Sequence, residues 1–179
     1  MSSKRRRYYL GLGSNLGDRR RRVEEAVERL RTKGVRVRAV SSIYRTEPVG
    51  PVVQPWFLNA AIGVESALSP GEMLRLVKSV ESGMGRKPGV RYGPRLIDID
   101  ILLAGRTVLR PPGLALPHPR MTGRRFVLVP LEEIAPLAVH PGARKTLRTL
   151  LRECPDRSRV IRLKRPLRRA GDSVQEGVE

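Results

Sequence analysis

Two stretches of the chain repeat their apolar residues at i, i+3, i+4 and i+7, the spacing of an amphipathic helix. The first follows Asp18, which can cap a helix N-terminus, and stops at Gly34. The second begins with Ser69 and Glu72, which form a capping box, and Pro70 takes the first helical position. The pattern therefore predicts two helices, with buried stripes formed by Val23, Ala26, Val27 and Leu30 in the first and by Met73, Leu76, Val77 and Val80 in the second.

Four further stretches are short and apolar, or alternate apolar with polar residues, which is typical of β-strands. They cover residues 8–14, 35–44, 56–65 and 96–105. Together with the two helices they give the order β-α-β-β-α-β, which is that of a ferredoxin-like layer. We therefore expect an α+β fold with a ferredoxin-like core.

The C-terminal part of the chain adds elements to this core. Residues 106–120 predict a short hairpin or loop, residues 124–136 a further packed segment, and residues 143–154 a final helix. The last residues are polar and charged, without apolar periodicity, as in a mobile tail. We therefore divide the chain into a basic extension at 1–7, a single domain at 8–163 and a flexible charged tail at 164–179.

The charge of the chain favours anionic partners. Its 36 Lys and Arg residues against 17 Asp and Glu give a net charge of +19, which attracts nucleotides, nucleic acids and other anions alike. No stretch resembles a membrane span or a signal peptide, and Cys154 alone cannot form an intrachain disulfide. His118 and His140 are the only histidines, which argues against a structural zinc site. We expect a cytoplasmic protein that does not bind membranes.

A basic ferredoxin-like layer is also compatible with RNA binding, as in RNA-recognition motifs. That mode stacks bases on aromatic residues of the sheet, yet only 4% of this chain is Phe, Trp or Tyr. The stretch "LIDID" would also place carboxylates on a sheet face, where they repel phosphate. We therefore expect only non-specific binding of nucleic acid.

The stretch "RYGPRLIDID", residues 91–100, places two carboxylates on one strand face. Asp98 and Asp100 are two residues apart, so their side chains point the same way, about 7 Å from each other. Such a pair is favourable if a cation lies between them, and Mg²⁺ commonly binds one or two carboxylates together with substrate phosphates. Alternatively, each aspartate pairs with an arginine such as Arg91 or Arg95; both arginines also suit phosphate.

A second strand offers a pocket for a planar heterocycle. Phe57 and Asn59 share one face, which places an aromatic ring beside an amide that donates and accepts hydrogen bonds. A Phe on a strand more often belongs to the core, and Phe126 is the only other Phe in the chain. The segment "GLGSNLGDR" does not match a dinucleotide fingerprint and predicts a tight turn that exposes backbone at a strand end.

Four segments carry a resemblance to a known family. "LGLGSNLGDR", "SSIYRTEPVGPVVQPWFLNAA", "GRKPGVRYGPRLIDIDILL" and "LPHPRMTGRRFVLVPLEEIAP" occur in this order. Together they resemble the 6-hydroxymethyl-7,8-dihydropterin pyrophosphokinases of the folate pathway, over about residues 8–153. The resemblance implies that the domain transfers a diphosphoryl group from ATP to the hydroxymethyl group of the pterin, releases AMP and uses two magnesium ions.

The resemblance also implies roles for individual residues. Asp98 and Asp100 match the metal ligands, and Arg86 and Arg95 match two functionally important arginines. The positions that match the pterin site are Thr46, Pro48, Val49, Phe57, Asn59 and Phe126. The positions expected to contact ATP are Glu81, Arg91, Tyr92, Ile101, His118 and Arg124.

Three positions depart from the family pattern. Tyr92 stands where many members have Trp, Lys78 where a neutral polar residue is common, and Pro119 where some members have Tyr. Carboxylates and arginines by themselves do not separate attack at the β-phosphorus from attack at the γ-phosphorus. A kinase that transfers only the γ-phosphoryl group is therefore the alternative, and its product would be ADP instead of AMP. A monomer is expected.

Overall fold

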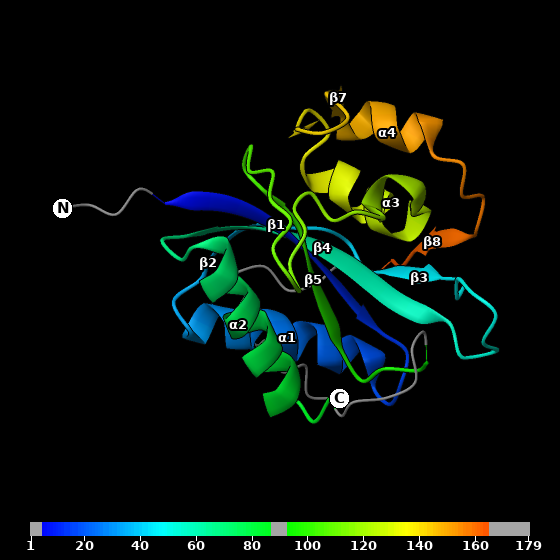
Figure 1. Ribbon diagram of the computed structural model, residues 1–179. Coiled ribbons are helices and arrows are strands. Elements are labelled where there is room, and N and C mark those ends of the chain that lie inside the picture. The colour runs from blue at the N-terminus through cyan, green and yellow to red at the C-terminus, as the bar shows by residue number, and fades with distance from the viewer. Residues whose placement is uncertain (1–4, 87–92, 165–179) are drawn as a thin grey trace.

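In the part of the chain that the structure describes, an antiparallel sheet of six strands forms the centre of the protein (Figure 1). The computed structural model describes residues 5–86 and 93–164. Strands lie in the order β5-β1-β4-β3-β8, and β2 also pairs with β4. Their bounds are Arg6–Ser14 for β1, Arg36–Val40 for β2, Tyr44–Thr46 for β3, Phe57–Ser66 for β4, Asp98–Ala104 for β5 and Val160–Arg162 for β8.

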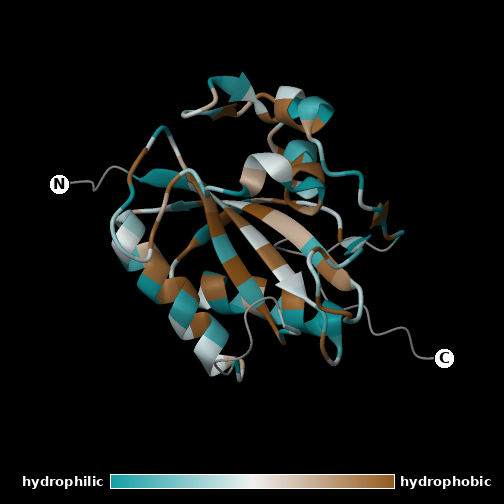
Figure 2. Ribbon diagram, turned by 45° about the vertical axis from the view of Figure 1, so that its right-hand side comes forward, coloured by the Kyte–Doolittle hydropathy of each residue, from teal (hydrophilic) through white to brown (hydrophobic). Residues whose placement is uncertain are grey.

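Four α-helices within the described residues cover the two faces of the sheet. Figure 1 shows α1 (Arg19–Thr32) and α2 (Pro70–Gly83) on one face, and α3 (Arg125–Ile134) and α4 (Leu147–Glu153) on the other. Each face has its own apolar core, and Figure 2 shows hydrophobic residues along the strands between the two helix layers. A short 3₁₀ helix, Met121–Gly123, precedes α3, and a two-stranded ribbon of β6 (Val139–His140) and β7 (Lys145–Thr146) precedes α4.

The caps expected at the first two helices are confirmed. The Asp18 side chain accepts from the backbone N of Arg21 at 3.1 Å, and Ser69 and Glu72 form the reciprocal capping box. Both predicted apolar stripes are buried, except that Leu76 is only partly buried. Glu81, which the apolar pattern does not include, is buried with them at 2% exposure.

The predicted strand at 35–44 is two strands instead of one. Ser41 and Ser42 separate the two strands: Ser41 bonds to β4 through its hydroxyl as well as its backbone, and Ser42 bonds to Glu133 of α3. The Ser41 hydroxyl accepts from the backbone N of Ala61 at 2.9 Å, and the backbone N of Ser42 donates to Glu133 Oε2 at 2.8 Å.

The other expected elements differ mainly at their ends. The first strand begins at Arg6, two residues earlier than expected, and so includes part of the basic extension. The final helix begins at Leu147 because the preceding residues form β7. The packed segment at 124–136 is α3, and one bridge between Leu109 and Leu116 closes the expected loop at 106–120. Strand β8 was not predicted.

The described residues contain no helix that is long and apolar enough to cross a membrane. The predictions for Arg91 and Tyr92, and nearly all of the tail at 164–179, lie outside the described residues.

Candidate active site

A pocket of about 190 Å³ lies between the sheet and the start of α3. Its floor comes from β1, β4 and β5, and its walls come from the loop after β3, the turn before β5 and residues 120–127. The pocket brings together predicted residues from distant parts of the chain: Thr46, Val49, Phe57, Asn59, Arg95, Asp98, Asp100, Arg124 and Phe126.

Two glycines of β1 form the part of the pocket floor that lies between the aspartates of β5 and the residues Phe57 and Asn59 of β4. Gly13 pairs in register with Asn59 of β4 on one side and with Asp98 of β5 on the other, and Gly11 pairs with Asp100. A Cβ atom on Gly13 would lie 2.6 Å from Asn59 Oδ1, so a larger residue would displace that amide. Both glycines lie inside the strand that was predicted at residues 8–14, and the turn expected at its end follows it, where Gly17 has a φ of 62°. The missed signal is the G-x-G spacing, which places both glycines on one strand face.

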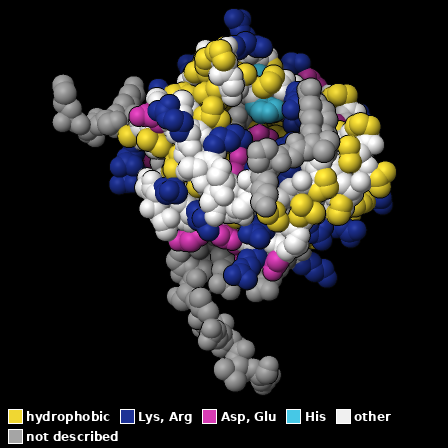
Figure 3. All heavy atoms as spheres, turned by 60° about the horizontal axis from the view of Figure 1, so that its bottom comes forward, with side chains coloured by type: hydrophobic (Ala, Val, Ile, Leu, Met, Phe, Trp, Pro, Cys, Tyr) yellow, Lys and Arg dark blue, Asp and Glu magenta, His cyan; other side chains and the backbone are white. Residues whose placement is uncertain are grey.

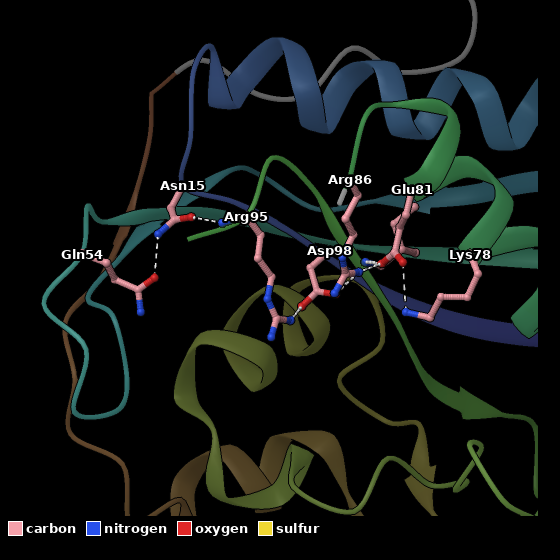
Figure 4. Close-up of polar contacts among 8 residues, drawn as sticks. Asn15, Gln54, Lys78, Glu81, Arg86, Arg95 and Asp98 are labelled. Carbon is pink, nitrogen blue, oxygen red and sulfur yellow. Dashed lines mark hydrogen bonds and ion pairs between the residues drawn. The ribbon is translucent and has the colours of Figure 1, made fainter. Parts of the chain in front are cut away.

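Asp98 lies between two arginines. Arg86 Nη1 donates to Asp98 Oδ1 at 2.7 Å, and Arg95 Nη1 donates to Asp98 Oδ2 (Figure 4). Burial alone would raise the pKa of Asp98, but the positive charges of Arg86 and Arg95 outweigh burial and lower it. The ion-pair alternative is thus confirmed for Asp98 with Arg95, and Arg86 is a second partner that it did not include.

Asp100 faces the same pocket in a different electrostatic setting. Within residues 5–86 and 93–164, no ion pair reaches its carboxylate. Burial raises the pKa of Asp100, and the charge of nearby Asp98 raises it further. A divalent cation between the two carboxylates would remove this repulsion. The described residues hold no cluster of three or more metal-ligating side chains, so the donor set fits a cation whose remaining ligands come from substrate and water, as is common for Mg²⁺.

Glu81 of α2 anchors the outer side of the arginine cluster. Its Oε1 accepts from the backbone N of Ile99 at 2.7 Å and pairs with Arg86, and its Oε2 accepts from Lys78 Nζ at 2.9 Å (Figure 4). Burial raises the pKa of Glu81 against the opposing effect of these donors. Arg86 therefore lies between two carboxylates: that of Glu81, which is hydrogen-bonded to the β5 backbone, and that of Asp98, which lines the pocket.

Asn15 is a buried residue near the site that was not among the predicted site residues. Its Oδ1 accepts from the backbone N of Arg95 at 2.7 Å, and its Nδ2 donates to Gln54 Oε1 at 2.9 Å (Figure 4). The same Nδ2 donates to Pro55 O at 3.2 Å. It thus joins the turn that carries Arg95 to the loop that precedes Phe57. Its position directly after the β1 strand was the available signal.

The other half of the pocket combines aromatic and amide groups. Phe57 of β4 and Phe126 of α3 both line it, and the Arg124 guanidinium lies 5.6 Å from the centre of the Phe126 ring. Asn59 Nδ2 donates to Thr46 Oγ1 at 2.7 Å, which fixes the orientation of this buried amide. Such a wall suits a planar ligand with hydrogen-bonding edges.

Some predicted site residues lie outside the pocket lining. Ile101 is 5% exposed and packs in the core on the other face of β5, which leaves its backbone as the group that could reach a ligand. Pro48 lies between two lining residues of the loop after β3. His118 Nδ1 accepts from the backbone N of Arg120 at 3.2 Å. Burial, with the charges of Arg124 and Arg120, lowers the pKa of His118 to about 4, so its imidazole is neutral at pH 7.

Comparisons with known proteins show the family of this chain. Residues 9–136 match the family model of 7,8-dihydro-6-hydroxymethylpterin-pyrophosphokinase (HPPK). The chain belongs to this family. It is 47% identical over 137 residues to the 2-amino-4-hydroxy-6-hydroxymethyldihydropteridine pyrophosphokinase of Methylorubrum extorquens, covering 76% of this chain and 87% of the relative. It is also 47% identical over 127 residues to the enzyme of the same name from Bacillus subtilis, covering 70% of this chain and 76% of the relative.

Solved structures share the fold of this HPPK chain. A crystal structure of wild-type Plasmodium falciparum HPPK-DHPS with pteroate has a TM-score of 0.67 and 18% sequence identity. The match covers 86% of this chain and 43% of that one, so the present chain spans less than half of the Plasmodium protein. At this identity the likeness concerns the fold alone.

Proposed function

We propose that the pocket transfers a diphosphoryl group from ATP to 6-hydroxymethyl-7,8-dihydropterin, giving the pterin diphosphate and AMP in folate synthesis. One observation carries this proposal: a site for a planar heterocycle and a site for phosphates face each other across the glycine floor of β1. This arrangement brings the alcohol of one substrate to the phosphates of the other.

The pterin half consists of the two phenylalanines and the amide of Asn59. Phe57 and Phe126 come from the sheet and from α3, and so can enclose a ring from two sides. The Asn59 amide, held by Thr46, offers its oxygen and nitrogen to the edge of the pterin. Thr46, at the end of β3, and Pro48 and Val49, in the loop that follows, complete this half.

The phosphate half centres on Asp98 and Asp100, which we assign as ligands of two Mg²⁺ ions. When bound, the ions neutralise phosphate charge and lower the pKa of the attacking hydroxyl. Arg95 and Arg86 are already aligned beside Asp98 and can donate bidentate hydrogen bonds to the triphosphate. Their positive charge then stabilises the charge that spreads over the phosphoryl oxygens during transfer.

Arg86 has two carboxylate partners in the absence of substrate, Glu81 and Asp98. Phosphate that arrives at Asp98 competes for its guanidinium, while Glu81 keeps its bonds to Lys78 and Ile99. Arg86 can therefore turn from Asp98 to the nucleotide without leaving Glu81 unpaired. The further ATP contacts that we assign are Glu81, Arg91, Tyr92, Ile101, His118 and Arg124.

The strand order also supports a finer description of the fold. Strands β1, β2, β4 and β5, with helices α1 and α2, follow the β-α-β-β-α-β order along the chain, and we describe this part as ferredoxin-like.

Four expectations stay predictions: the division of the chain at residues 7 and 163, the monomeric state, the cytoplasmic location and the non-specific binding of nucleic acid. Figure 3 is consistent with the last of these, because Lys and Arg side chains are spread over the visible face instead of forming one stripe.

A product assay tests the proposed function. The protein is incubated with Mg²⁺, ATP and 6-hydroxymethyl-7,8-dihydropterin, and AMP and ADP are separated and quantified. Pterin-dependent AMP is the expected result. ADP would show transfer of the γ-phosphoryl group instead, and no turnover would contradict the proposal.

A further inference from the structure

The segment 156–162, which includes β8, lies outside the pocket and contacts the neighbours of its two aromatic residues, Phe57 and Phe126. It lies beyond the residues that match the HPPK family model, which end at 136. It was not among the site residues expected from the sequence. We call this segment the C-terminal strap.

The strap is bound to the start of the loop that follows β3. Arg159 N donates to Glu47 Oε2 and Arg159 Nε donates to Glu47 Oε1, both at 2.7 Å. In return, Glu47 N donates to Arg159 O at 3.2 Å. Glu47 itself lines the pocket. One arginine thus binds both the backbone and the carboxylate of a pocket residue.

The same arginine also contacts the end of that loop. The Arg159 guanidinium lies 4.8 Å from the centre of the Trp56 ring, and that of Arg45 lies 4.6 Å from it. Arg19 Nη1 donates to Trp56 O at 2.6 Å. Trp56 directly precedes Phe57, the aromatic residue that the pocket takes from the sheet. Arg159 therefore holds both ends of the loop 47–56.

The other end of the strap is bound to the start of α3. Asp156 Oδ2 accepts from the backbone N of Arg125 at 2.8 Å, and Asp156 Oδ1 accepts from the backbone N of Ser158 at 2.9 Å. Arg125 directly precedes Phe126, the second aromatic residue of the pocket. A carboxylate at a helix N-terminus is favourable, because it accepts from an N–H without a partner in the helix.

Strand β8 is fixed independently of Arg159. It pairs with β3 through the backbone, Arg162 Nε donates to Ser42 Oγ at 2.8 Å, and Arg162 Nη2 pairs with Glu133 Oε1 at 3.2 Å. Leu163 N also donates to Ile43 O at 2.9 Å. Loss of the Arg159 side chain should therefore leave the strand and the backbone bonds to Glu47 in place, and remove only the side-chain contacts with Glu47 and Trp56.

We propose that the C-terminal strap sets the spacing between Phe57 and Phe126, and that Arg159 and Asp156 are positioning residues for the pterin. The inference rests on the proposed function, since it assigns the pocket between Phe57 and Phe126 to the pterin. Neither Arg159 nor Asp156 lines the pocket. Their effect reaches the substrate through Glu47 and Trp56 on one side and through the N-terminus of α3 on the other.

The test compares Arg159→Ala with a control that removes an equally exposed ion pair. The side chains of Arg159 and Glu47 are 69% and 30% exposed, and those of Arg148 and Glu132, on α4 and α3, are 65% and 26% exposed. Arg148→Ala is therefore the matched control. The KM for pterin, the KM for ATP, kcat and the melting temperature are measured for each variant, starting from wild-type protein that forms pterin-dependent AMP.

We expect Arg159→Ala to raise the KM for pterin about fivefold, because an ion pair and a stacked guanidinium are lost together. The KM for ATP and kcat should change by less than about twofold, and Arg148→Ala should leave all three within that range. Arg159→Lys should recover part of the loss, because it keeps the charge but not the planar fork.

A second variant tests the other attachment. Asp156→Ala should also raise the KM for pterin, by releasing the N-terminus of α3 instead of the loop. An unchanged KM for pterin in both variants, or an equal rise in the KM for ATP, would overturn the role of the strap while the activity stands. Wild-type protein without pterin-dependent AMP would overturn the proposed function and the role of the strap with it.

Discussion

Gly13 of β1 and Asn59 of β4 are register partners, and the absence of a side chain on Gly13 leaves the space that the Asn59 amide occupies. A Cβ atom there would approach Asn59 Oδ1 to 2.6 Å, well inside van der Waals contact. Asn59 is 7% exposed and donates to Thr46 Oγ1 at 2.7 Å, so it has little freedom to move away. The orientation of this amide therefore depends on the glycine opposite.

We predict that Gly13→Ala displaces Asn59 and weakens pterin binding. The free energy of unfolding should fall by about 1–3 kcal/mol through overpacking, and the KM for pterin should rise more than about tenfold. Steady-state kinetics and urea unfolding measure the two effects. Gly63→Ala on β4 is the control, because its nearest neighbour would be Tyr9 Cε1 at the ordinary distance of 3.4 Å. Equal kinetics for both variants would refute a special role for Gly13.

We predict that Asp98→Asn and Asp100→Asn both lower turnover more than about a hundredfold, because each removes a carboxylate that we assign to Mg²⁺. Their effects on stability should differ. Asp98→Asn leaves Arg95 without its carboxylate partner and Arg86 with Glu81 alone, and should cost about 1–3 kcal/mol. Asp100→Asn removes a repulsion and should leave stability unchanged or slightly higher.

Chemical unfolding and Mg²⁺-dependent AMP formation measure both properties of the two variants. Glu132→Gln, on α3 and outside the pocket lining, is the control for the loss of one negative charge. Full turnover by either aspartate variant would contradict the assignment of that residue to the metal. A large loss of stability in Asp100→Asn would show instead that its carboxylate has an attractive partner.

Local signals in the sequence predicted the first two helices and the shared face of the two aspartates on the acidic strand. The cap at Asp18 and the capping box at Ser69 are contacts between residues close in sequence, and the apolar spacing is a property of each helix by itself. The sequence alone therefore contains these signals. The shared face of Asp98 and Asp100 follows from strand geometry in the same way. These features required no knowledge of which elements are neighbours.

The features that the sequence did not reveal depend on contacts between distant segments. Strand β8 exists because Val160–Arg162 pairs with β3, more than a hundred residues earlier, and its own residues alternate too little to predict a strand. Glu81 is buried because the backbone N of Ile99 needs an acceptor, which the helical pattern does not show. The role of Asn15 likewise appears only when the turn at Arg95 lies beside it.

We predict that Arg86→Ala lowers kcat about a hundredfold and changes the affinity for pterin less than about threefold. Arg86 contacts Glu81 and Asp98 on the phosphate side, and it does not line the aromatic half of the pocket. Rapid-quench kinetics and pterin titration separate the two quantities. Arg29→Ala, which removes a surface pair with Glu25, is the control. Equal losses of kcat and of affinity would place Arg86 in ground-state binding.

We predict that His118 makes the protein less stable as the pH falls below 6.5. Burial, aided by the charges of Arg124 and Arg120, lowers the pKa of His118 from 6.5 to about 4. Between these values the unfolded chain binds a proton that the folded protein does not, so unfolding becomes more favourable with each step toward acid. Stability from the neutral imidazole is therefore complete above pH 6.5 and is lost as the pH approaches 4.

The difference in stability between pH 7 and pH 4.5 should be smaller in His118→Gln than in the wild type, by no more than about 3 kcal/mol. Urea unfolding at the two pH values measures it. His140→Gln serves as the comparison, because burial also lowers the pKa of His140, although that residue lies in β6, outside the pocket lining. If His118→Gln lost as much stability between pH 7 and pH 4.5 as the wild type, the imidazole would take up its proton at the same pH in the folded and the unfolded protein. The geometry around it favours the neutral form, because Nδ1 accepts a hydrogen bond from the backbone N of Arg120 and a proton on that atom would break the bond.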